Sequence, residues 1–145
     1  MRAVVQRVSE ASVTSDGHPV GSIGPGLCVL LGVTHDDSSA MATKMAAKLW
    51  NLRIFDDEAS VMNLSLAETS KQILVVSQFT LYGDTSGGRR PSWTAAARPE
   101  LAEPLVSETV HALRALGAHV ETGRFRTNMQ VTLVNDGPVT VIIDL

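Results

Sequence analysis

The sequence is poor in cysteine and in aromatic residues: it has one Cys, two Trp, one Tyr and three Phe in 145 residues. The lone Cys28 permits no disulfide within the chain, which is typical of a reducing compartment. Its place in the apolar run 27–31 predicts a buried, inert thiol. No apolar run approaches the roughly 20 residues of a membrane helix, and residues 1–7 do not resemble a signal peptide. We therefore expect a cytoplasmic protein with no membrane partner.

The sequence also lacks an excess of positive charge: it has 12 Lys and Arg against 15 Asp and Glu, for a formal net charge of −3. Proteins that follow long stretches of nucleic-acid backbone are usually basic, since they neutralise phosphates. The charge therefore argues against extensive wrapping of a nucleic acid. It leaves open the binding of one end of an RNA.

The length predicts a single domain, 1–145. Residues 2–14 and 18–23 are expected to form a hairpin around the turn Asp16-Gly17. Apolar runs at 26–33 and 72–81 predict strands covered on both faces. The other expected elements are helices ending near Arg53 and Gly117, with prolines 99 and 104 near helix starts, and strands at 119–125, 129–134 and 139–143. This order predicts an α+β fold: a largely antiparallel sheet, curled or closed into a barrel, with two main helices on one side.

The segment 77–84 places polar residues at the end of an otherwise apolar strand. Ser77, Gln78 and Thr80 offer hydroxyl and amide groups beside Phe79, and Gly83 permits a sharp turn. A strand end of this kind suits the binding of a carbonyl or phosphate group. The simpler interpretation is a strand terminus whose polar groups are satisfied locally.

A second segment, Asn-Asp-Gly-Pro at 135–138, predicts a tight turn between two strands. The bond before Pro138 is one that proteins adopt in cis at modest cost. Gly137 before it is permissive enough to aim two consecutive carbonyl oxygens in the same direction.

Conventional catalytic patterns are missing. Thr80 is a candidate nucleophile, but a hydroxyl needs a general base, and none of the four histidines lies in a triad pattern. No metal-binding spacing and no phosphate-binding glycine loop occurs, so we expect neither a metal nor a cofactor. The loop Arg89-Arg90 with Trp93 is interpreted equally well as solvated surface or as a contact to RNA.

The octapeptide SQFTLYGD at 77–84 and the hexapeptide NDGPVT at 135–140 resemble the two hallmark motifs of the D-aminoacyl-tRNA deacylases. The opening MRAVVQRV is also similar to the start of that family, and the motif spacing matches. The resemblance implies a homodimeric editing hydrolase that cleaves the ester of D-aminoacyl-tRNA, and of mischarged glycyl-tRNA(Ala), without metal or cofactor.

The same resemblance implies roles for individual residues. In the family, the pair that corresponds to Gly137-Pro138 is cis and enters the partner subunit's site, where its carbonyl oxygens reject L-amino acids, and Arg7 matches the arginine that holds it. The pocket residues of the family correspond to Ser77, Gln78, Phe79, Thr80, Phe125 and Met129. The 2′-hydroxyl of the tRNA is expected to assist attack by water, with Thr80 as nucleophile in second place.

One stretch departs from the family. After Gly123-Arg124-Phe125 the family commonly has small residues, often Gly-Ala, where this chain has Arg126 and Thr127. The departure leaves the seating of the terminal adenosine open, and Arg126 offers a possible phosphate contact. Two other classes also stay open: a hydrolase that uses Thr80 on a different ester or peptide, and an inert dimer that binds RNA or a small ligand.

Overall fold

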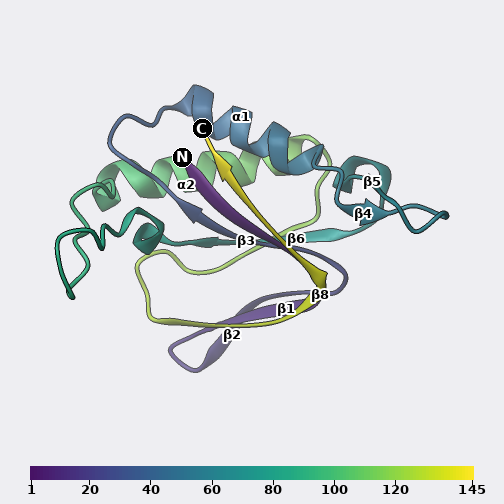
Figure 1. Cartoon of the computed structure of the whole chain (residues 1–145), viewed down its shortest axis with the longest axis horizontal. Helices are drawn as coiled ribbons and strands as arrows, with labels where there is room; N and C mark the ends of the chain where they lie inside the picture. Colours follow the sequence, from purple (N-terminus) through teal and green to yellow (C-terminus); the bar gives the residue numbers. More distant parts are fainter.

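The fold is organised around one long strand, β1 (Arg2–Ser15), in a computed structural model that describes residues 1–145. Antiparallel to β1 run β2 (His18–Ile23), β3 (Gly26–Gly32) and, on its other edge, β8 (Met129–Asp144) (Figure 1). The turn between β1 and β2 has positive φ at both Asp16 (51°) and Gly17 (78°), which confirms the predicted hairpin.

The sheet is mixed and nearly closed. Beyond β3, the strands β6 (Gln72–Ser77) and β7 (Val120–Thr122) pair in parallel, giving the order β2-β1-β3-β6-β7 with β8 beside β1. The two ends of this order meet: a Cβ on Gly21 of β2 would lie 2.8 Å from the carbonyl oxygen of Thr122 in β7. The curled sheet of an α+β fold is thus confirmed.

Two helices cover one face of the sheet, as predicted (Figure 1). These are α1 (Ser39–Trp50), which buries Met45 and Leu49, and α2 (Pro99–Ala115), which buries Leu105 and Leu113. Pro99 begins α2, where its missing N–H costs little, whereas Pro104 lies inside the helix. None of the helices is long and apolar enough to cross a membrane.

Two apolar cores lie on the two faces of the sheet. The larger one fills the space between sheet and helices, and the smaller one fills the inside of the curl. Leu27 and Val75 belong to the first core, and Cys28 and Leu74 to the second, so β3 and β6 are covered on both faces as predicted. Cys28 is buried in the smaller core, and burial raises the pKa of its thiol to about 11.

The strand expected over 72–81 is shorter than predicted. It ends at Ser77, and the 3₁₀ helix η2 (Phe79–Tyr82) follows. The backbone N–H of Gln78 still donates to the carbonyl of Leu31 (2.8 Å), but β3 ends at Gly32 and offers no further backbone partner. The chain therefore turns just where the polar residues begin.

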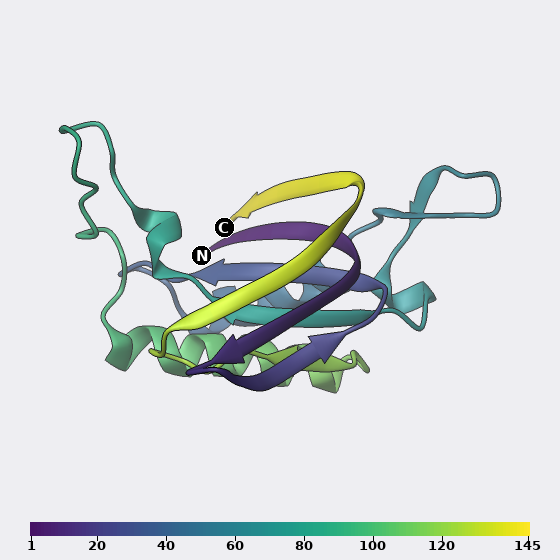
Figure 2. The same ribbon diagram turned by 90° about the horizontal axis from the view of Figure 1, so that it is seen from below.

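The turn predicted at 135–138 is wrong. β8 is one strand that follows β1 along its whole length, pairing Met129 with Ser15 at one end and Asp144 with Arg2 at the other (Figure 2). The Asn-Asp-Gly-Pro segment makes an irregularity inside this strand, where the register shifts between Gln6 and Val8. Its turn-forming residues bend the strand and do not reverse it.

A small outlying hairpin was not predicted. It consists of β4 (Phe55–Asp56) and β5 (Met62–Leu64) and is followed by the 3₁₀ helix η1 (Leu66–Glu68). On the other side of the molecule, the ammonium of Met1 donates to a carboxylate oxygen of the buried Asp37 (2.5 Å) and to the carbonyl of Leu145 (3.0 Å).

Candidate active site

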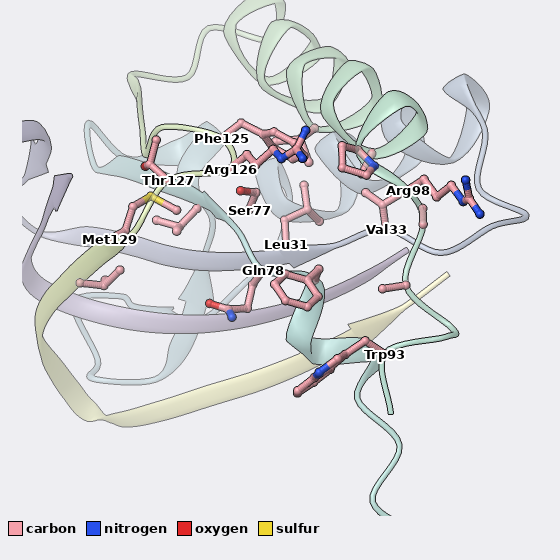
Figure 3. Close-up of a pocket in the computed structure, with 18 residues that line it drawn as sticks. Leu31, Val33, Ser77, Gln78, Trp93, Arg98, Phe125, Arg126, Thr127 and Met129 are labelled. Carbon is pink, nitrogen blue, oxygen red and sulfur yellow. The ribbon is translucent and has the colours of Figure 1, made fainter. Parts of the chain in front are cut away.

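A cavity of about 640 Å³ opens at the C-terminal end of β6, where the sheet meets the start of α2 (Figure 3). Most of its lining is apolar, as in most sites for small organic ligands. The lining residues predicted from sequence are Ser77, Gln78, Phe79, Phe125 and Met129. Thr80 follows directly on Phe79 but does not line the cavity.

One wall is aromatic. The rings of Phe79 and Trp93 meet edge to face, with centroids 5.5 Å apart and an interplanar angle of 72°. Phe79 is 56 % exposed and Trp93 is 41 % exposed, which is unusual for large apolar side chains. Gly83 has an ordinary φ of −71°, and its role is to admit the Trp93 ring, which a Cβ would strike.

The polar end of the cavity lies where β6 turns into η2. The side-chain amide of Gln78 donates to the Thr80 hydroxyl, and both lie near the surface. The backbone N–H groups of Phe79 and Thr80 donate no hydrogen bond within the chain. Two free donors beside an apolar cavity suit a carbonyl oxygen.

The turn from 123 to 129 forms a second side of the cavity. Gly123 lets Met129 pack close, because a Cβ there would lie 2.7 Å from the Met129 sulfur. Thr127 donates to the carbonyl of Arg124 (3.0 Å), and its hydroxyl accepts from the fully buried Ser15 (2.8 Å). These bonds tie the turn to the end of β1. The sequence did not predict how this turn seats the terminal adenosine, because Arg126 and Thr127 depart from the family pattern.

The third side of the cavity was missed from sequence. It is formed by the loop before α2 and the first turns of that helix, through Ala96, Ala97, Arg98, Pro99, Ala102 and Val106. The five apolar residues among them have the pattern of ordinary core residues, and only the tertiary fold shows that they face a cavity. A smaller cavity of about 200 Å³ adjoins the first and shares Ser77, Val106 and Phe125 with it.

The Gly137-Pro138 pair lies away from the cavity of its own chain and lines no part of it. The peptide bond is cis, and Gly137 has a φ of +118°. Arg7, which is 8 % exposed, donates to the backbone carbonyls of Asp136 (3.2 Å) and Ile54 (2.9 Å). An ion pair with Asp56 (3.1 Å) adds to this anchorage.

Asn135 fastens the same segment from the other side. Its side-chain amide donates to the carbonyls of Arg7 (3.2 Å) and Val139 (3.0 Å). The exposed pair is therefore held by side-chain contacts on both flanks.

No histidine is hydrogen-bonded to Thr80, whose hydroxyl accepts from Gln78. His35 contacts the carbonyl of Thr94 (2.7 Å), His119 lies 3.6 Å from Glu121, and His111 lines only the smaller cavity. No three His, Cys, Asp or Glu side chains come together in a group able to hold a metal ion.

Fold and site together define an α+β protein whose apolar cavity has free backbone donors at one end and an aromatic wall, an arrangement suited to an acyl group. The family model for D-Tyr-tRNA(Tyr) deacylase matches residues 4–144. The chain therefore belongs to the D-Tyr-tRNA(Tyr) deacylase family, a family of hydrolases.

Individual relatives agree with this assignment. A D-aminoacyl-tRNA deacylase of Symbiobacterium thermophilum is 60 % identical over 99 % of this chain and 95 % of its own length. One from Streptomyces coelicolor is 58 % identical with both chains fully covered. Among solved structures, the c-Myc DNA unwinding element binding protein superposes with a TM-score of 0.92 at 38 % identity, covering 100 % of this chain and 99 % of its own. A probable eukaryotic D-amino acid tRNA deacylase shares the fold, with a TM-score of 0.87 at 18 % identity over 99 % and 98 % of the two chains.

Proposed function

We propose that this protein is a cytoplasmic homodimer that hydrolyses the ester between a D-amino acid and tRNA, and that it also releases glycine from mischarged glycyl-tRNA(Ala). The observation that carries the proposal is the cavity at the end of β6, which brings Ser77, Gln78 and Phe79 of the first motif together with Phe125 and Met129. An aminoacyl group fits a cavity of this size and polarity. The extensive identity with deacylases supports the choice of substrate.

The chemistry proposed is ester hydrolysis assisted by the substrate itself. The 2′-hydroxyl of the terminal ribose orients a water molecule, whose oxygen bonds to the carbonyl carbon. The ribose 3′-oxygen then leaves with a proton, so that the products are the free amino acid and intact tRNA. The developing oxyanion would be bound by the backbone N–H groups of Phe79 and Thr80, which donate no hydrogen bond within the chain. Attack by Thr80 itself is the second candidate, and it lacks a neighbouring base.

Rejection of L-amino acids is assigned to Gly137-Pro138 of the partner subunit. The pair is exposed, lines no part of its own chain's cavity and is fixed by Arg7 and Asn135. A rigid, protruding backbone segment of this kind suits a neighbouring molecule's site. Its carbonyl oxygens would clash with an L side chain and leave room for a hydrogen, which is specificity by exclusion.

Mixed dimers test the cross-subunit role. One subunit carries Gly137→Ala, and the other carries Ala96→Trp, which is expected to fill its own cavity. If the segment serves the partner, the open cavity faces an intact Gly137-Pro138 pair and the mixed dimer still spares L-tyrosyl-tRNA. Loss of that discrimination would show that the segment serves its own chain. Homodimers of each variant are the controls.

The hydrolytic activity itself is tested with D-tyrosyl-tRNA. We expect free D-tyrosine and a tRNA with an intact 3′-terminal adenosine, both identified by mass spectrometry. Tight binding of the aminoacylated tRNA without release of D-tyrosine would refute the proposal and favour an inert binding protein.

A further inference from the structure

We propose that Arg126 is a binding residue for the phosphodiester on the 5′ side of the substrate's terminal nucleotide, an inference that rests on the proposed function. Two charged residues line the main cavity, Arg98 and Arg126, and both are positive. Neither takes part in an ion pair, and no acidic residue lines this space. In a chain with a formal net charge of −3, this concentration of positive charge favours an anion at the cavity.

The two arginines are not equivalent. In Figure 3 the guanidinium of Arg126 lies on the cavity side with Phe125 and Ser77, whereas that of Arg98 points outward. Arg126 thus presents its donors beside the part of the cavity assigned to the acyl ester. A guanidinium binds phosphate oxygens through paired hydrogen bonds, which makes it a suitable receptor for this group.

The backbone at Arg126 adds an independent argument. Its φ is +59°, a conformation that glycine adopts at much lower cost than arginine. The turn is held there by Thr127, whose hydroxyl accepts a hydrogen bond from the buried Ser15. Residues kept in such conformations cluster at functional sites. Arg126 thus has a strained backbone, lines the cavity and forms no ion pair within the chain, and together these features indicate a ligand for its guanidinium.

The chemistry of the substrate identifies the anion. The aminoacyl group carries an ammonium and the ester is neutral, so neither attracts a guanidinium. With the ester at Ser77 and Phe79, the nearest negative charge is the phosphodiester on the same ribose. Arg126 is therefore expected to contribute to binding of the nucleotide and to take no part in bond cleavage.

The test compares two minimal substrates: 3′-O-D-tyrosyl-adenosine, and the same ester carrying a methyl phosphodiester at its 5′-oxygen. Kinetics are measured for the wild type, Arg126→Ala and Arg126→Gly. The matched control is Arg124→Ala, which removes an exposed arginine of the same turn that does not line either cavity. Arg126→Gly also relieves the positive φ, so that it is expected to be at least as stable as the wild type.

For both Arg126 variants we expect kcat/KM to fall about tenfold with the phosphate-bearing ester, mainly through KM, as befits the loss of one charge-assisted hydrogen-bonded pair. The nucleoside ester should be cleaved at the wild-type rate. With D-tyrosyl-tRNA, the slope of log kcat/KM against log salt should become shallower by about 0.7, the value for one phosphate on a single strand. Arg124→Ala should leave all three quantities unchanged.

Equal losses on the two small esters, or no loss on either, would overturn the inference and leave the proposed function standing. The same holds if Arg124→Ala matches Arg126→Ala, since that would indicate a diffuse effect of charge. A wild-type protein that hydrolyses neither small ester nor D-tyrosyl-tRNA would refute the proposed function, and this inference with it.

Discussion

Gly137→Ala probes the segment on which chiral selection is proposed to depend. Gly137 has a φ of +118°, where residues with a side chain are strained. The added Cβ would lie 2.7 Å from a guanidinium nitrogen of Arg7 and 2.9 Å from a methyl group of Val139. Arg7 cannot retreat freely, because it is buried and bonded to Ile54 and Asp56. We expect a loss of about 2 kcal/mol in the free energy of unfolding, within the range for backbone strain at one residue.

For a domain of this size, each kcal/mol lowers the melting temperature by roughly 2–4 °C, so a fall of roughly 4–8 °C should appear by calorimetry. The displaced carbonyl oxygens should also admit L-tyrosyl-tRNA, which is measured as a rise in its deacylation rate.

Gly17→Ala is the matched control, since Gly17 also has a positive φ (+78°) but no atom lies within 4 Å of the added Cβ. It should cost only about 1 kcal/mol and leave the rejection of L-tyrosyl-tRNA intact. A Gly137→Ala protein with wild-type stability and wild-type selectivity would refute the reasoning.

Three further predictions concern other parts of the molecule. Asp37→Ala should cost about 3–5 kcal/mol in urea unfolding, because it leaves the buried ammonium of Met1 unpaired; a loss below about 1 kcal/mol would contradict this. Burial raises the pKa of Cys28 to about 11, so the folded state retains a proton that the unfolded state loses. The free energy of unfolding should therefore fall as pH rises from about 9 to about 11, and the fall should be smaller in Cys28→Ala. Thr80→Val should retain deacylase activity within about tenfold, since the hydroxyl contacts Gln78 and has no base beside it, whereas a loss on the order of 10⁴-fold would identify Thr80 as the nucleophile.

Local sequence signals predicted the elements that depend on local physics. The Asp16-Gly17 turn was correct because a turn with two positive φ angles admits few other residues. The predictions of β3 and β6 were correct because both faces of these strands are buried, and a continuous apolar run indicates such burial.

The errors fall where a distant partner decides the outcome. The Asn-Asp-Gly-Pro segment has the residues of a reversal, yet β1 is long enough to pair with both halves of β8, so that the strand continues through it. Likewise Phe79 and Leu81 are good strand residues, but β3 has already ended and no neighbour remains to pair with them. Tertiary pairing overrides local preference in both cases.

The site was predictable to a similar degree. Residues 77–79 were singled out because polar groups at the end of an apolar strand are conspicuous, and they do line the cavity. The part of the cavity lining that α2 supplies could not be predicted from the sequence, because Ala102 and Val106 have the pattern of any core-facing helix positions. Gly137, Pro138 and Arg7 were singled out only by the family resemblance, and none of them lines the cavity of the same chain. The proposed chiral selection therefore depends on the proposed partner subunit.

The central claim is that this protein removes amino acids from tRNA according to chirality. The most direct measurement follows the release of labelled amino acid from D-tyrosyl-tRNA, L-tyrosyl-tRNA and glycyl-tRNA(Ala) at equal concentrations. Rapid loss of the D-tyrosyl and glycyl esters, with the L-tyrosyl ester spared, is the predicted result. Equal loss of the two tyrosyl enantiomers would contradict the account, because no chiral filter would then operate.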